Sequence, residues 1–185
     1  DPLLSGGRIW DIEKIWGKMC DASKRVTGKI EKGRIAGVTV TTFGVDGTFF
    51  DGSGKMLYPV ISWQCERTAP IMRNIGKYIP LDDLYSECGV LPFNFNTINK
   101  LIWFNENKPG IIEKSNIFLF MPSIFSYFLT GSMVNDATMS GTSMLTNLSS
   151  RQFSEKILGS INIPEEKLGL PVEAGTITGV VTAGA

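Results

Sequence analysis

The spacing of apolar residues along the chain changes several times, and these changes predict an order of elements. Between Trp10 and Val26 large apolar residues recur near helical spacing behind Asp11, which predicts a capped amphipathic helix. Residues 34–43 are mostly β-branched or small, a pattern typical of a central strand covered on both faces. Thr48–Phe50 and Met56–Trp63 flank an Asp-Gly turn, which predicts a hairpin.

From Arg67 onward the pattern is mainly helical. The predicted helices and helical turns cover residues 67–78, 81–88, 97–107, 110–114, 123–129, 140–148, 154–158 and 164–168. The last residues, 180–185, have the composition of a strand. A helix, a strand, a hairpin and then a helical layer predict an α/β or α+β domain, and 185 residues suit one domain or one part of a larger protein.

Composition narrows the possible functions. Lys plus Arg and Asp plus Glu both number 18, so the zero net charge offers no basic surface for nucleic acid or an anionic membrane. The most apolar stretch, Ile117–Leu129, is interrupted by Pro122 and is shorter than the roughly 20 residues of a membrane span. There is no histidine, which excludes Ser-His-Asp, Cys-His and His-metal chemistry within this sequence. Three cysteines without C-x-x-C spacing suggest reduced thiols in a cytoplasmic protein and no metal site.

The segment from Thr41 to Gly47 is the first candidate site. It runs from the predicted strand into a turn in which Gly44 and Gly47 flank Asp46. Ligands of open α/β sheets bind beyond the carboxyl ends of strands, and a carboxylate there can accept hydrogen bonds from sugar hydroxyls. The alternative is that Asp46 only stabilises a turn, and the residues alone leave both interpretations open.

Two further clusters have the composition of a polar pocket. Trp63 offers an aromatic face and Arg67 lies at a predicted helix start, although, taken alone, a core tryptophan and a surface arginine paired to Glu66 explain them better. Phe95 and Asn96 belong to a loop of alternating aromatics and amides, where Asn96 can instead cap the following helix. Residues 129–142 and 173–179 are rich in hydroxyls and turn formers but lack the spacing of a phosphate-binding loop.

The order of these segments resembles the first domain of the FGGY carbohydrate kinases. The segment 35–47, ending Thr-Thr-Phe-Gly-Val-Asp-Gly, is the closest match. It is followed at matching distances by 57–63, Arg67-Thr68, Phe95-Asn96-Thr97, Lys100-Leu101-Ile102-Trp103, Leu129-Thr130-Gly131, 136–143 and 172–175. The resemblance covers residues 10–179, nearly the whole chain.

This resemblance implies an actin-like, ribonuclease H-type α/β domain that binds a sugar, with a second similar domain that binds ATP. The implied reaction transfers the γ-phosphoryl of Mg-ATP to the 1-hydroxyl of L-fuculose or a similar ketose. In rhamnulose kinases the matching Gly-Val-Asp position contacts the sugar, so Gly44 and Asp46 are the first candidates for substrate binding. Trp63, Arg67, Phe95 and Asn96 follow by position, and a homo-oligomer is compatible with the resemblance.

Two departures from the family pattern concern phosphate and metal. Members open with an Asp-x-Gly strand, for which we find no counterpart here, and their catalytic Asp follows an Ala-Gly pair where this sequence has Ala185. We therefore expect residues 1–179 to be the sugar-binding domain, residues 180–185 to lead toward the second domain, and no catalytic residue, Mg²⁺ ligand or ATP site within this sequence. A rhamnulose or other ketose kinase, or an inactive actin-like binding module, are the alternatives.

Overall fold

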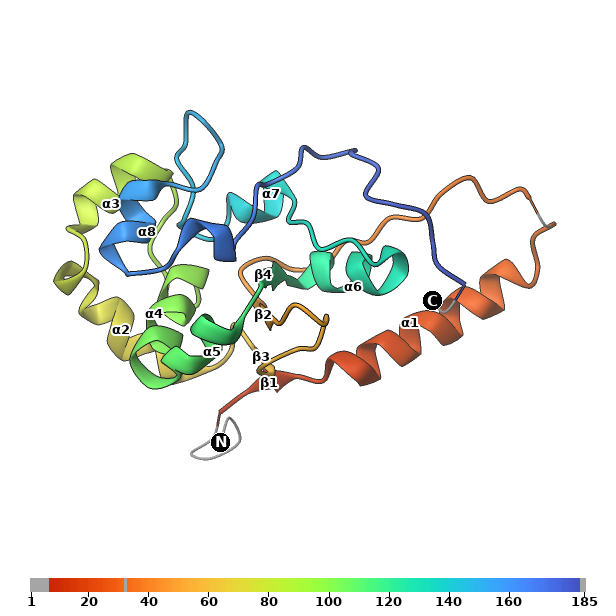
Figure 1. Ribbon diagram of the computed structural model, residues 1–185, viewed down its shortest axis with the longest axis horizontal. Helices are drawn as coiled ribbons and strands as arrows, with labels where there is room; N and C mark the ends of the chain where they lie inside the picture. The colour runs from red at the N-terminus through yellow and green to blue at the C-terminus, as the bar shows by residue number, and fades with distance from the viewer. Residues whose placement is uncertain (1–6, 32, 184–185) are drawn as a thin grey trace.

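Four short strands lie at the centre of the molecule, and helices cover them on two sides (Figure 1). The computed structural model describes residues 7–31 and 33–183. The strands are β1 (Ile9–Trp10), β2 (Gly47–Phe50), β3 (Val60–Ile61) and β4 (Ile117–Phe120). β2 pairs antiparallel with β4, with Gly47 opposite Phe120, and β1 pairs antiparallel with β3, with Ile9 opposite Ile61.

Most of the remaining regular secondary structure is helical. The fold is therefore mixed α/β, as expected. The helices are α1 (Ile12–Thr27), α2 (Ala69–Arg73), α3 (Leu81–Cys88), α4 (Thr97–Asn107), α5 (Pro109–Lys114), α6 (Met121–Thr130), α7 (Ala137–Ser140) and α8 (Glu155–Ser160). Single 3-10 turns occur at η2 (Glu66–Thr68), η3 (Ile75–Lys77) and η4 (Glu165–Lys167). The predicted cap of the first helix is confirmed, since the Asp11 carboxylate accepts a hydrogen bond of 2.9 Å from the Lys14 amide.

The strands separate two hydrophobic cores because neighbouring side chains point to opposite faces. In β2, Phe49 packs into the larger core under α2 to α5 and α8, while Phe50 packs into the smaller core under α1 and α6 (Figure 1). In β4, Phe118 alternates in the same way with Leu119. Both faces are covered, so β4 is a continuous apolar run, and the polar Thr48 of β2 is buried with its hydroxyl donating to the Tyr58 carbonyl at 2.7 Å.

The strand predicted for residues 34–43 is wrong. The segment is extended but belongs to no strand, and most of it is exposed, including Ile35 at 50% and Val38 at 59%. Among the described residues it has no neighbouring strand with which to pair its amides and carbonyls. The argument that placed Asp46 at the end of a central strand therefore fails, and Asp46 instead lies directly before β2.

The predicted hairpin is only partly present. The turn after β2 exists, since the Gly54 amide donates to the Asp51 carbonyl at 3.0 Å and Phe50 bridges Met56. However, the ladder partner of β2 is β4, and β3 pairs with β1.

Other differences concern boundaries. The helix predicted for residues 67–78 is divided into η2, α2 and η3, and the helical turn predicted for 140–148 is the earlier and shorter α7. β4 was not predicted at all. Residues 180–183 form no strand, and residues 184–185 lie outside the described part.

Candidate functional site

The turn from Gly44 to Asp46 has an unusual backbone. Val45 has φ of 65°, in the left-handed region that a β-branched residue rarely adopts, and the Asp46 amide donates to the Gly44 carbonyl at 2.9 Å. This three-residue turn has the hydrogen bond and the sign of φ of a classic γ-turn, which is strained. The surrounding structure must therefore hold it in place.

Helix α4 supplies the groups that hold this turn. Its Lys100 ammonium and Thr97 hydroxyl both donate to the Val45 carbonyl, each at 2.9 Å. The amide of Met121, the first residue of α6, donates to the Asp46 carbonyl at 2.8 Å. The turn is thus attached to both helices that begin beside it.

The Asp46 carboxylate is fully buried and accepts three hydrogen bonds from the protein. One oxygen forms an ion pair with Lys100, whose side chain is 1% exposed. The other accepts from the Trp10 indole at 2.6 Å and from the Trp63 amide at 3.0 Å. Burial lowers the pKa of Lys100, and the adjacent Asp46 charge opposes this effect. The pair has no net charge, which suits an uncharged ligand better than an anion.

Exposed aromatic rings lie next to this buried group. The Trp63 side chain is 42% exposed and meets the Phe95 ring edge to face at 6.3 Å. Phe95 in turn stacks on Phe93 at 4.9 Å with an angle of 8° between the rings. On the Trp10 side, the indole lies against the Phe43 ring at 4.6 Å. A polar turn with apolar rings around it has the composition of a small-molecule site.

The contacts of Gly44 and Asn96 indicate structural roles more than ligand binding. A Cβ atom on Gly44 would stand 3.1 Å from the Thr142 hydroxyl, so a larger residue here would require the Thr142 side chain to shift by a few tenths of an ångström. Asn96 is 2% exposed and its side chain accepts from the Phe93 amide at 2.6 Å, which fixes the aromatic loop. Asn96 precedes α4, but it makes no side-chain cap to that helix.

Arg67 points to a different group of residues. Its guanidinium donates to the Cys65 sulfur at 3.0 Å and to the Tyr58 hydroxyl at 3.3 Å, and it lies over the Trp103 ring at 4.9 Å. Burial raises the pKa of Cys65, but hydrogen bonds from Arg67 and from the Arg8 amide outweigh it and the net shift is downward.

The structure brings Gly44, Asp46 and Trp63 together, and it adds two residues that bind Asp46, Trp10 and Lys100, which were not sequence candidates. Trp10 was treated as a helix residue, yet it belongs to β1. Lys100 appeared only within the matched segment 100–103. Its position directly before the apolar residues Leu101 and Ile102 of α4 was the available signal.

The described residues contain no cluster of three or more His, Cys, Asp or Glu side chains that could hold a metal ion. Within the described ranges, no helix has the length and apolarity needed to cross a membrane.

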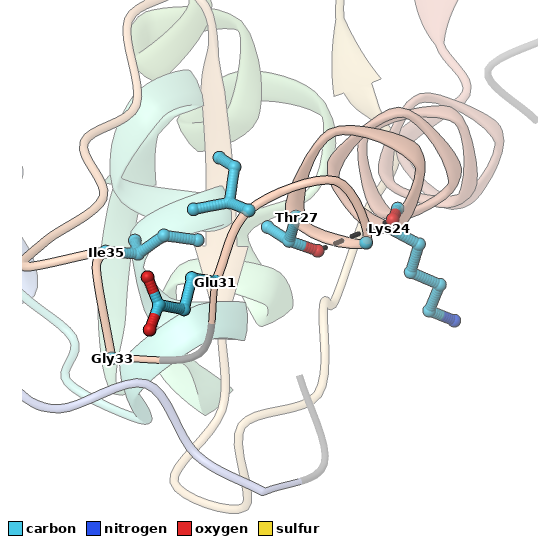
Figure 2. Close-up of a pocket in the computed structure, with 7 residues that line it drawn as sticks. Lys24, Thr27, Glu31, Gly33 and Ile35 are labelled. Atoms are coloured by element: carbon cyan, nitrogen blue, oxygen red, sulfur yellow. Dashed lines mark hydrogen bonds between the residues drawn. The ribbon is translucent and has the colours of Figure 1, made fainter.

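An open hollow of about 360 Å³ lies at the far end of α1, away from these groups in sequence. Figure 2 shows it between the helix end and the loop that follows, lined by Lys24, Thr27, Gly28, Ile30, Glu31, Gly33 and Ile35. It is built from one continuous segment and shares no residue with the turn. We do not include it in the candidate site.

Comparisons with known proteins agree with this architecture. L-fuculokinase from Escherichia coli (strain K12) is 39% identical over 172 residues, covering 93% of this chain and 36% of the relative. Rhamnulokinase from Bacteroides thetaiotaomicron is 27% identical over 179 residues, covering 97% of this chain and 36% of the relative. The crystal structure of gluconate kinase from Lactobacillus acidophilus superposes with a TM-score of 0.87 at 19% identity, covering 98% of this chain and 37% of that one.

The chain thus spans little more than a third of the length of the curated relatives it matches. The family model described as "FGGY family of carbohydrate kinases, N-terminal domain" matches residues 4–185. This chain belongs to the FGGY family of carbohydrate kinases and has the fold of their N-terminal domain.

Proposed function

We propose that this chain is the sugar-binding domain of an ATP-dependent kinase that phosphorylates the 1-hydroxyl of L-fuculose. The observation that carries the proposal is the strained Gly44–Asp46 turn beside the exposed Trp63 ring and the half-buried Phe95 ring. The 39% identity to L-fuculokinase supports the choice of sugar.

In this proposal the sugar lies against the turn, with its hydroxyls toward Asp46 and its C–H surface toward the aromatic rings. An ionised carboxylate has about four acceptor positions, and three of those on Asp46 are already used by the protein. Asp46 therefore accepts one sugar hydroxyl when all three donors stay in place, rather than the two that a free carboxylate would accept. Because the carboxylate is fully buried, we expect Trp10, the half-buried one of its two side-chain donors, to move aside when the sugar enters, which frees a second acceptor position.

The remaining parts of the reaction come from outside this chain. Phosphoryl transfer depends chiefly on positioning and on charge neutralisation by metal and donor groups. We assign sugar binding to residues 1–179 and a connection toward an ATP-binding domain to residues 180–185. ATP and Mg²⁺ then bind mainly to that second domain, in a cytoplasmic enzyme.

The second candidate is a rhamnulose kinase, favoured by the 27% identity to rhamnulokinase over 97% of the chain. A ketose of either kind fits the neutral pair of Asp46 and Lys100. The alternative from a different functional class is an actin-like binding module that has no kinase activity.

The test uses the full-length protein that contains this chain, assayed with ATP for ADP formation on L-fuculose, L-rhamnulose, xylulose, gluconate and glycerol. We expect the highest kcat/KM for L-fuculose. Highest activity on L-rhamnulose would select the second candidate, and no activity on any sugar would leave the binding module.

A pair of variants links activity to the site. Trp63→Ala removes a ring of the proposed sugar surface and should raise KM for the sugar about tenfold, with little change in KM for ATP. Tyr85→Ala removes an aromatic ring of similar exposure, 49% against 42%, from α3 and serves as the matched control. Equal sugar KM values for the two variants would contradict the proposed position of the sugar.

A further inference from the structure

The turn at Val45 is strained in a way that local sequence does not explain. Four non-glycine residues among those described have positive φ, namely Val45, Met144, Arg151 and Asn162, and Val45 is the β-branched member of the set. Such conformations persist only where the surroundings impose them, and they are concentrated at binding and active sites. A glycine at this position would adopt the same φ without strain.

Lys100 is the group best placed to impose this conformation. Its ammonium bridges the Val45 carbonyl and the Asp46 carboxylate, so one side chain fixes the orientation of two successive residues. Burial of this charge on α4, between Asn99 and Leu101 that are also fully buried, is costly. Replacing a buried ion pair as a whole by apolar residues of similar volume is often neutral or stabilising, so stability alone does not account for a lysine paired with Asp46 here.

We propose that Lys100 is a positioning residue for sugar binding, which holds the Gly44–Asp46 turn in its left-handed conformation without contacting the sugar. This inference rests on the proposed function, because it assigns the turn to the sugar site. It predicts that the loss of Lys100 is corrected by a residue that adopts positive φ unaided.

The experiment compares Lys100→Met, Val45→Gly and the double variant in the full-length protein. Lys100→Met should raise KM for the sugar about ten- to a hundredfold, as expected for loss of a charge-assisted hydrogen bond that orders the site, and leave KM for ATP within about twofold. Val45→Gly in the Lys100→Met background should recover at least about a third of this loss on a logarithmic scale. Lys167→Met is the matched control, because the Lys167 ammonium also donates to a backbone carbonyl, that of Ser115 at 2.6 Å, but away from the turn.

A second measurement does not depend on the sugar. The Met121 amide donates to the Asp46 carbonyl, so its hydrogen exchange reports whether the turn is in place. Exchange should be faster in Lys100→Met and return toward the parent rate in the double variant. If no sugar is phosphorylated by the parent protein but this pattern holds, the proposed function fails while the role of Lys100 in holding the turn stands.

The inference is overturned if Lys100→Met is folded and its sugar KM matches that of Lys167→Met, or if Val45→Gly restores neither KM nor exchange. Should Lys100→Met fail to fold, the comparison is made between Asp46→Asn and Asp46→Asn/Lys100→Met, in which no unpaired carboxylate remains buried. A sugar KM and a Met121 exchange rate that are equal in these two proteins would overturn it as well.

Discussion

The ion pair between Asp46 and Lys100 allows a sharp prediction about stability. Both side chains are buried, at 0% and 1% exposure, so removing one partner leaves a charge that water cannot reach. Such removals cost about 3–5 kcal/mol of unfolding free energy. In Lys100→Met the carboxylate keeps the Trp10 and Trp63 donors, so we expect a cost near the lower limit, about 3 kcal/mol.

Asp46→Asn should show a different dependence on pH. It leaves the Lys100 ammonium with the Val45 carbonyl and a neutral amide, which further lowers a lysine pKa that burial already depresses. The folded variant then gives up its proton at a lower pH than the unfolded chain does. Because the unfolded state binds more protons in that interval, stability of this variant should rise with pH toward the ordinary lysine pKa of about 10.4.

The double variant Asp46→Asn/Lys100→Met contains neither charge and should cost less than the sum of the single changes by about 2–3 kcal/mol. Urea unfolding followed by tryptophan fluorescence measures all four proteins, and equal m-values show that the denatured states are comparable. If the effects of the single changes add to within about 0.5 kcal/mol, the two residues are energetically independent and the reasoning is refuted.

Three further predictions test other parts of the fold. Val60→Ala should lower the free energy of unfolding by about 2 kcal/mol because Val60 is fully buried. Val38→Ala, at a position that is 59% exposed, should lower it by less than about 0.5 kcal/mol in the same urea assay. Equal losses would mean that residues 34–43 are packed. Gly47→Ala should destabilise the protein by about 2 kcal/mol or more, because its Cβ would overlap a carbonyl of β4, and an unchanged melting temperature would contradict the pairing of β2 with β4. Burial and the hydrogen bond to Glu106 raise the pKa of Tyr78 to about 12. The free energy of unfolding should therefore fall as pH rises from the ordinary tyrosine pKa of about 10 toward that value. In Tyr78→Phe, the absorbance titration of the tyrosines should lose its latest phase. A phase that persists in Tyr78→Phe belongs to another tyrosine.

Local signals identified the helices well because each helix carries its own evidence. α1 has a cap and an amphipathic pattern, and α3 ends at Gly89, whose φ of 66° is the usual left-handed stop. The division between β4 and α6 was harder to predict. Ile117–Leu129 is one apolar run, in which neither the two-residue period of a strand nor the 3.6-residue period of a helix is visible. The change from strand to helix takes place at Met121, one residue before Pro122.

Strands depend on partners that composition does not reveal. Residues 34–43 have the strongest β propensity in the chain, but propensity describes how well a residue fits a sheet that must already be there. The same limit applied to the candidate site, where local motifs could be recognised from the sequence and long-range contacts could not. Its turn residues are visible as a Gly-Val-Asp-Gly motif, whereas the contacts of Asp46 with Trp10 and Lys100 span 36 and 54 residues, which no local pattern reports.

The exposure of residues 34–43 also affects how the protein behaves in the laboratory. The nine residues from Ile35 to Phe43 carry no charge and no proline, and most of them are exposed, including the β-branched Ile35 and Val38. Such segments add readily to a matching strand of another molecule and promote aggregation. Protein concentration then becomes a variable in every stability measurement on this chain, because association adds to the apparent free energy of unfolding. Val38→Lys should extend the concentration range over which the chain stays monodisperse.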